Sequence, residues 1–188
     1  MKVLLFVTTI LALSGCNSLR GGSDALVLPD KAFPSHIPSH IDYQGERYTL
    51  RQWNGQSGEY YRDGEQGYQW QKLITLNLSE GTSLEDFAQA MQTQLQRENT
   101  LHALKRQADS LDIRVLYPPQ PQHPHFSGYE SNSMRYQSSA CGISGLQYAE
   151  QHAADGDAQQ LFAALQAEQA DFQRQAVEIL ASISCPKK

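Results

Sequence analysis

The sequence of 188 residues has few cysteines, a deficit of positive charge and no long apolar run. Its three cysteines are too few for a dense disulfide framework, and with six histidines they leave little for an all-protein zinc site. Fifteen Lys and Arg residues against twenty Asp and Glu give a net charge of −5, which provides no basic surface for nucleic acid. No segment has the roughly 20 apolar residues of a membrane-spanning helix. The 40% apolar fraction is nevertheless enough for a folded core.

Signatures of the common enzyme classes are also missing. Residues 142–145 (GISG) lack the spacing of a nucleophile elbow, and neither GxxxxGK[ST] nor GxGxxG occurs. The neighbouring carboxylates Glu85 and Asp86 begin a predicted helix, where they complement the helix dipole. We therefore expect a protein that is not an enzyme and carries no cofactor, and a hydrolase ranks behind two binding functions.

The chain begins with a predicted export signal. Lys2 supplies one positive charge, and residues 3–13 (VLLFVTTILAL) carry none, a length typical of a signal-peptide core. Residues 13–16 (LSGC) resemble the lipobox of bacterial lipoprotein precursors at all four positions. The resemblance implies removal of residues 1–15, a diacylglycerol on the Cys16 sulfur and acylation (palmitate) of its amine. The alternative is an ordinary secretory signal that contains a cysteine.

An acylated Cys16 would anchor the protein to a membrane without spanning it. Each buried methylene contributes roughly 0.8 kcal/mol, and stable attachment needs two acyl chains. Asn17 follows the cysteine where an aspartate would be expected for retention at the inner membrane. In a Gram-negative cell the resemblance therefore implies the inner leaflet of the outer membrane, with the protein on the periplasmic side.

Residues 16–41 are expected to form a flexible tether, because they contain Gly21, Gly22 and three prolines. The tetrapeptide Pro-Ser-His-Ile is written twice in succession, at 34–37 and 38–41. Its two histidines, His36 and His40, could form a metal-binding pair. They have no acidic or cysteine neighbour to complete a site, so an extended linker is the preferred interpretation.

Residues 42–188 are expected to form one globular domain that begins with a three-strand meander. Asn54-Gly55 separates two alternating runs and predicts a type I′ hairpin turn, and Asp63-Gly64 offers a second reversal. From Tyr68 to Leu78 apolar and polar residues alternate, which predicts a third strand with one face on a core.

Two amphipathic helices are predicted. Thr82–Glu85 fits a capping box, and a helix is expected from Ser83 to at least Gln96, with a possible extension to Gln107. An apolar stripe from Leu161 to Ile183 predicts one long helix or two in tandem. Its polar face is not basic, so packing on a sheet is favoured over lying on a membrane.

Three further alternating runs predict strands at 111–117, 127–137 and 143–152. The proline-rich segment 118–125 must be a loop. Its His123 and His125 could share a metal, but a zinc site needs more protein ligands, and a solvated loop is favoured. The predicted class is α+β, with an antiparallel sheet of about six strands packed against two amphipathic helices.

Part of the domain resembles the PsbP/Mog1-like α/β sandwiches. The resemblance rests on Glu59-Tyr60, Gly64-Glu65 and residues 70–75 (WQKLIT), followed by a helix and later by residues 146–148 (LQY). It covers about half of the chain. It implies a single-domain sandwich and transfers no functional residue.

Cys141 and Cys185 form an even pair in an exported protein, where oxidation is favoured. We predict a disulfide between them, and closing a loop of about 45 residues would stabilise the fold by about 4 kcal/mol. The alternative is two buried free thiols.

Two functions remain open. The first is an accessory module that binds another protein of the envelope and no nucleic acid. The second is a small-molecule or lipid-binding module, with Tyr60, Tyr61, Tyr68 and Trp70 lining a cleft between sheet and helices. Aromatic residues at strand spacing are more often part of a core, so the first function is preferred.

Overall fold

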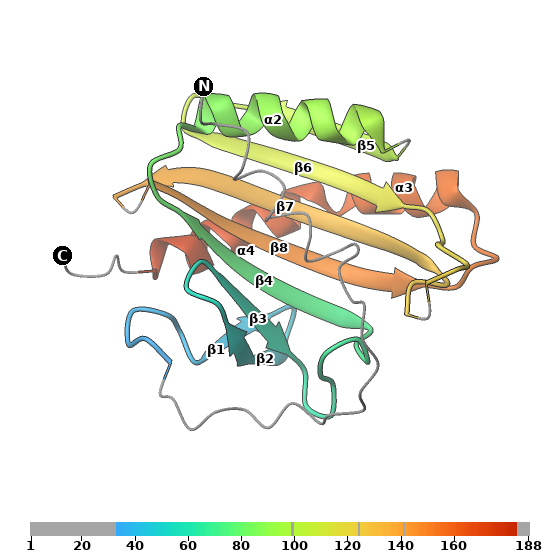
Figure 1. Ribbon diagram of the computed structural model, residues 1–188, viewed down its shortest axis with the longest axis horizontal. Coiled ribbons are helices and arrows are strands. Elements are labelled where there is room, and N and C mark those ends of the chain that lie inside the picture. Colours follow the sequence, from blue (N-terminus) through green and yellow to red (C-terminus); the bar gives the residue numbers. More distant parts are fainter. Residues whose placement is uncertain (1–32, 99, 124, 141, 184–188) are drawn as a thin grey trace.

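The computed structural model describes residues 33–98, 100–123, 125–140 and 142–183 (Figure 1). The predicted lipidation of Cys16 and the predicted disulfide between Cys141 and Cys185 lie outside these ranges. No helix within the described ranges has the length and apolar character needed to cross a membrane.

One antiparallel sheet of eight strands dominates the structure, in the order β1-β2-β3-β4-β8-β7-β6-β5. The strands are β1 (His40–Tyr43), β2 (Glu46–Trp53), β3 (Ser57–Tyr61), β4 (Lys72–Ser79), β5 (Leu101–Arg106), β6 (Ser110–Tyr117), β7 (Tyr129–Ser139) and β8 (Gly142–His152). Strands β1 to β4 and strands β5 to β8 each form a meander. The two meanders meet where β4 pairs with β8, from Lys72 opposite Glu150 to Ser79 opposite Ile143.

The α+β class with an antiparallel sheet is confirmed, but the predicted count of about six strands was too low. Strand β1 crosses the predicted boundary between the tether and the domain at residue 41, and β5 lies where the first helix was allowed to extend. Both are edge strands with a partner on one side only. Such strands are short and half packed, so their sequences carry little alternation.

The first hairpin is present, but its turn differs from the predicted type I′. Strand β2 ends at Trp53 and β3 begins at Ser57, so three residues connect them. Gly55 has a positive φ of 97°, whereas Asn54 is not among the residues with positive φ. The Asn54 carboxamide oxygen instead accepts hydrogen bonds from the backbone N–H groups of Gln56 and Ser57, at 3.0 and 2.7 Å. The turn is therefore stabilised by the Asn54 side chain, and not by the left-handed backbone conformation of Asn54 that a type I′ turn requires.

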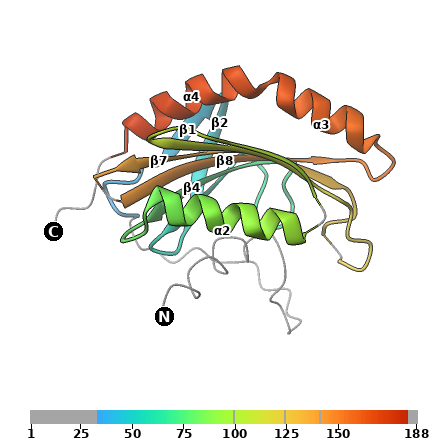
Figure 2. The same cartoon turned by 90° about the horizontal axis from the view of Figure 1, so that it is seen from above.

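Three helices within the described ranges cover both faces of the sheet, one more than predicted (Figure 2). Helix α2 (Leu84–Arg97) lies on one face, and α3 (Ala158–Ala167) and α4 (Gln169–Ala181) lie in tandem on the other. Ser83 caps α2 by accepting a hydrogen bond from the backbone N–H of Asp86, and Asp157 caps α3 in the same way. Glu168 separates α3 from α4, so the second stripe forms two helices in tandem.

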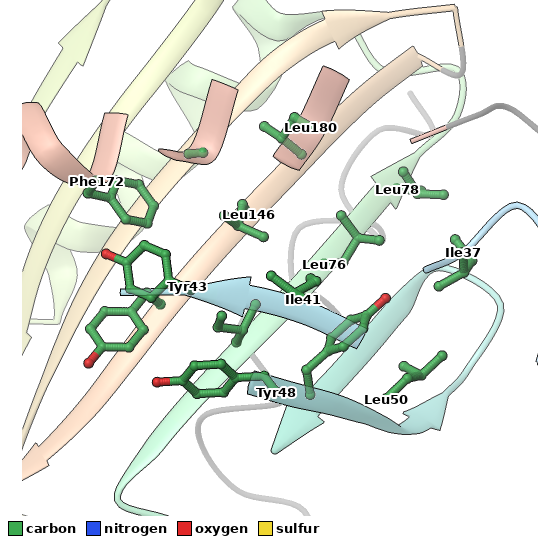
Figure 3. Close-up of a cluster of buried hydrophobic side chains, with 14 residues drawn as sticks. Ile37, Ile41, Tyr43, Tyr48, Leu50, Leu76, Leu78, Leu146, Phe172 and Leu180 are labelled. Carbon is green, nitrogen blue, oxygen red and sulfur yellow. The ribbon is translucent and has the colours of Figure 1, made fainter. Parts of the chain in front are cut away.

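Two hydrophobic cores result from these layers. The first lies between α4 and strands β1 to β4 and β8, and Figure 3 shows Phe172 and Leu180 of α4 above Leu146 of β8. Ile37 and Ile41 of the repeated tetrapeptide are buried in this core (Figure 3). The second copy of the repeat is thus part of the folded domain, and the first contributes Ile37 to it. The second core lies between α2 and strands β6 to β8, with a contribution from Leu104 of β5.

Candidate functional site

Four aromatic and imidazole rings gather at one end of the sheet, and we call them the aromatic cluster. They are Tyr68, in the connection between β3 and β4, and His123, His125 and Phe126, in the loop between β6 and β7. Tyr68 and His125 are stacked with their ring centroids 4.7 Å apart and their planes 2° apart. Phe126 lies edge-on to Tyr68 at 6.0 Å and 4.4 Å from His123. Tyr68 is 52% exposed, so the cluster lies at the surface.

The loop that carries three of these rings is held by its own hydrogen bonds. The backbone N–H of Gln120 donates to the carbonyl of Phe126 at 2.7 Å, and that of His123 donates to the carbonyl of Gln120 at 2.8 Å. The N–H of His125 donates to Nδ1 of His123 at 3.3 Å. One imidazole nitrogen of His123 is therefore occupied. In the part of the chain that the structure describes, no three His, Cys, Asp or Glu residues are grouped as metal ligands.

A small buried cluster lies next to the aromatic cluster. It consists of Tyr61, Trp70 and Ala149, with Leu73 packed against it. The Tyr61 hydroxyl donates to the Glu59 carboxylate. Burial raises the pKa of Tyr61, and the charges of Glu59 and Tyr68 add to this effect. Tyr61 is thus a buried group close enough to the surface ring of Tyr68 to feel its charge.

The four aromatic residues that were predicted to line a cleft do not face one space. Consecutive residues of a strand point to opposite faces of the sheet. Tyr60 therefore packs in the first core, where its hydroxyl donates to the carbonyl of Pro38 at 3.0 Å, while Tyr61 lies on the opposite face. Tyr61 and Trp70 are in one buried cluster, and Tyr68 is at the surface. The predicted ligand-lining set is corrected accordingly.

A row of polar side chains crosses the sheet face that α2 covers, close to the loop between β6 and β7. Tyr117, Glu130 and Gln151 occupy directly opposite positions on β6, β7 and β8, and we call them the polar row. The Asn132 amide donates to Glu130 Oε1 at 2.9 Å, and the Gln147 amide donates to Asn132 Oδ1 at 2.5 Å. A polar network thus continues inward from the row.

Three atoms of this region are buried without a hydrogen-bond partner among the described residues: Tyr117 Oη, Gln151 Nε2 and Oε2 of Glu98, the residue that follows α2. Burial raises the pKa of Glu130 to about 7, against the opposing effect of the hydrogen bond from Asn132. Burial also raises the pKa of Tyr117, and the charges of Glu98 and Glu130 raise it further. Buried groups without partners usually mark a water site, a ligand site or a functional network.

Sequence reasoning missed the polar row because its members belong to no spacing motif. Only the strand register makes Tyr117, Glu130 and Gln151 neighbours. One signal was available: β7 (YESNSMRYQSS) is a central strand with few apolar residues on either face. A central strand normally reads as predominantly apolar on at least one face, so its polar half was a pointer to a special role.

A protein-family model matches residues 35–180 of the chain. The chain belongs to this family. The match spans both cores, the aromatic cluster and the polar row. No curated protein matches the sequence.

Among solved structures, the Ran-binding protein Mog1p of Saccharomyces cerevisiae is similar. The TM-score is 0.39 and the sequence identity is 13%, over 78% of this chain and 83% of that chain. This is a weak structural resemblance to one of the proteins in the class that the sequence pattern resembled.

Proposed function

We propose that the protein is a lipid-anchored module of the bacterial cell envelope that binds another envelope protein. The observation that carries the proposal is the position of the exposed aromatic cluster at the end of the sheet opposite the start of the described chain. His36 packs edge-on against Trp53, beside the β2–β3 turn. The loops with Tyr68 and His125 lie at the other end of the strands (Figure 1).

This arrangement suits a tethered binding module. A chain that is anchored at Cys16 and enters the domain near Trp53 would present the aromatic cluster away from the membrane. Rings that are already stacked lose little conformational freedom on binding, and aromatic residues dominate the energetic centres of protein interfaces. The net charge of −5 makes an acidic polymer an unfavourable partner.

Replacing Cys16 by alanine tests the anchor. We expect the wild-type protein in the membrane fraction and the variant either in the soluble fraction or as an unprocessed precursor, because acyl chains supply the attachment. Thermal unfolding of the released variant should match that of the wild type. A variant that resists extraction from membranes by salt and carbonate would contradict the anchor.

Replacing Tyr68 by alanine tests the binding surface. A photo-crosslinking residue at Gln122, an exposed loop position, should capture one or two envelope proteins reproducibly in cells. We expect Tyr68→Ala to reduce this capture about tenfold, the size of a moderate interface hot spot. Phe33→Ala removes another exposed ring, 37% exposed against 52% for Tyr68, at the opposite end of the sheet and serves as the control. Equal capture in both variants would show that the aromatic cluster is not the binding surface.

Binding of a small molecule is the second candidate, and the unpartnered atoms of the polar row favour it. A ligand there would accept a hydrogen bond from Gln151 Nε2, and it would exchange one with the Tyr117 hydroxyl, which can donate or accept. Native mass spectrometry of the purified chain would then find a copurified molecule, and Tyr117→Phe should lower its occupancy.

A further inference from the structure

The sheet face beneath α3 and α4 is polar along β6 and β7, although the opposite face of the same strands packs against α2. Three rows of opposed residues cross these two strands on the polar face: Ser110 with Gln137, Asp112 with Arg135, and Arg114 with Ser133. Ser144 of β8 lies opposite Gln137 and extends the first row. Most of these side chains are buried, including both serines of the first row, Asp112 and Arg114.

This buried layer carries more positive than negative charge. Nη1 of Arg135 donates to both carboxylate oxygens of Asp112, at 2.8 and 3.0 Å. Arg114, which is 2% exposed, donates to the backbone carbonyls of Ile113 at 2.9 Å and Gln169 at 3.3 Å. Neither of these acceptors is a carboxylate. Two guanidinium groups therefore share one buried carboxylate.

No carboxylate is hydrogen-bonded to Arg114 among the described residues. The guanidinium carbon lies 4.8 Å from the centre of the Phe172 ring. Burial is the main cause that lowers the pKa of Arg114, and the charges of Asp112 and Glu168 oppose it. Glu168 is exposed at the joint between α3 and α4. A buried cation that lacks its own counter-ion is costly, and proteins normally supply an anion to it.

The same layer contains donor groups without acceptors. Among the described residues, five buried side-chain atoms have no hydrogen-bond partner: Nε of Arg114, Nε of Arg135, Nε2 of Gln173, and the hydroxyls of Ser110 and Ser144. Gln173 lies one helical turn after Gln169, whose carbonyl accepts from Arg114. All five groups can donate, and none is a carboxylate. An ordered water could pair with some of them, but it would not balance the charge.

We propose that a small oxyanion, a phosphate, sulfate or carboxylate group, binds between α4 and strands β6 to β8. Its oxygens accept hydrogen bonds from Arg114, Arg135 and Gln173, and its charge balances the second guanidinium. Access requires local opening of the helix pair. Helix α3 buries only Leu165 among its residues, so it can separate from the sheet at low cost. This site is separate from the aromatic cluster and does not depend on the proposed function.

Thermal unfolding of the full-length chain in detergent tests the site. Inorganic phosphate, sulfate and acetate are each titrated against chloride at constant ionic strength. We expect a saturable rise in Tm for at least one oxyanion, about 5 °C at a hundredfold excess over its Kd. The relative size of the saturable Tm rise for the three anions then distinguishes a phosphate or sulfate ligand from a carboxylate ligand.

Arg114→Gln removes the unbalanced charge and should abolish the saturable response. Arg47→Gln removes an exposed guanidinium and should leave it unchanged. Gln173→Leu is a milder variant that keeps the charge and removes one of the proposed donors, and it should weaken the apparent affinity about tenfold if Arg114→Gln does not fold. Phosphate and sulfate also stabilise proteins by exclusion from their surface. A response that does not saturate, or that is the same in all variants, would overturn the proposal.

Discussion

Glu130→Gln is expected to raise the free energy of unfolding by about 3 kcal/mol at pH 8 and by about 1 kcal/mol at pH 5. Burial raises the pKa of Glu130 from 4.5 to about 7. The folded state therefore holds the proton more tightly than the unfolded chain. Stability falls as the pH rises from about 4.5 to 7, and above that range the charged carboxylate destabilises the fold. Glutamine stays neutral and keeps the oxygen that accepts the hydrogen bond from Asn132.

Urea unfolding of both proteins between pH 5 and pH 8 measures this effect. The difference between the two curves removes the contribution of groups that titrate alike in both proteins. Glu178→Gln is a suitable control because Glu178 is exposed on α4. It should change the free energy of unfolding by less than about 0.5 kcal/mol at either pH. If Glu130→Gln and the wild type showed the same pH dependence, the carboxyl would be hydrated in the folded protein.

Local patterns in the sequence were sufficient to predict most of the helices and central strands. The capping box was predicted at Thr82–Glu85, and the N-cap lies one residue later, at Ser83, whose hydroxyl accepts a hydrogen bond from the Asp86 N–H that the helix leaves free. The alternation from Tyr68 to Leu78 contains β4, because one face of that strand packs on a core. Edge strands β1 and β5 were missed, since half of their pairing is absent and their patterns are short. The pattern also did not specify that the Asn54 side chain would close the hairpin.

The sites could not be predicted to the same extent, because strand register creates them. Tyr117, Glu130 and Gln151 become neighbours only when β6, β7 and β8 pair in one particular alignment. The same is true of Asp112 and Arg135. Alternation shows which residues share a face of a strand but not which residues of the next strand lie beside them. The aromatic cluster needs a further step, since a loop must fold onto Tyr68.

The polar layer beneath α4 offers a second large effect. Asp112→Ala is expected to lower the free energy of unfolding by about 3–5 kcal/mol, because it leaves two buried guanidinium groups without a carboxylate. Asp42→Ala is the matched control. Arg47 donates to the two Asp42 oxygens at 2.8 and 3.1 Å, close to the 2.8 and 3.0 Å at Asp112. The side chain of Asp42 is 58% exposed, whereas that of Asp112 is 1% exposed.

The distances at the two aspartates are alike, although Arg47 donates from two nitrogens and Arg135 from one, and the largest difference between the two pairs is their burial. Water replaces the lost carboxylate around Arg47, so Asp42→Ala should cost no more than about 1 kcal/mol. Arg135, with a side chain that is 12% exposed, has no such access to solvent. Urea unfolding at neutral pH compares the two variants directly. Equal losses would mean that the Arg135 side chain reaches water once Asp112 is removed, and that helix α4 does not hold the charged layer closed.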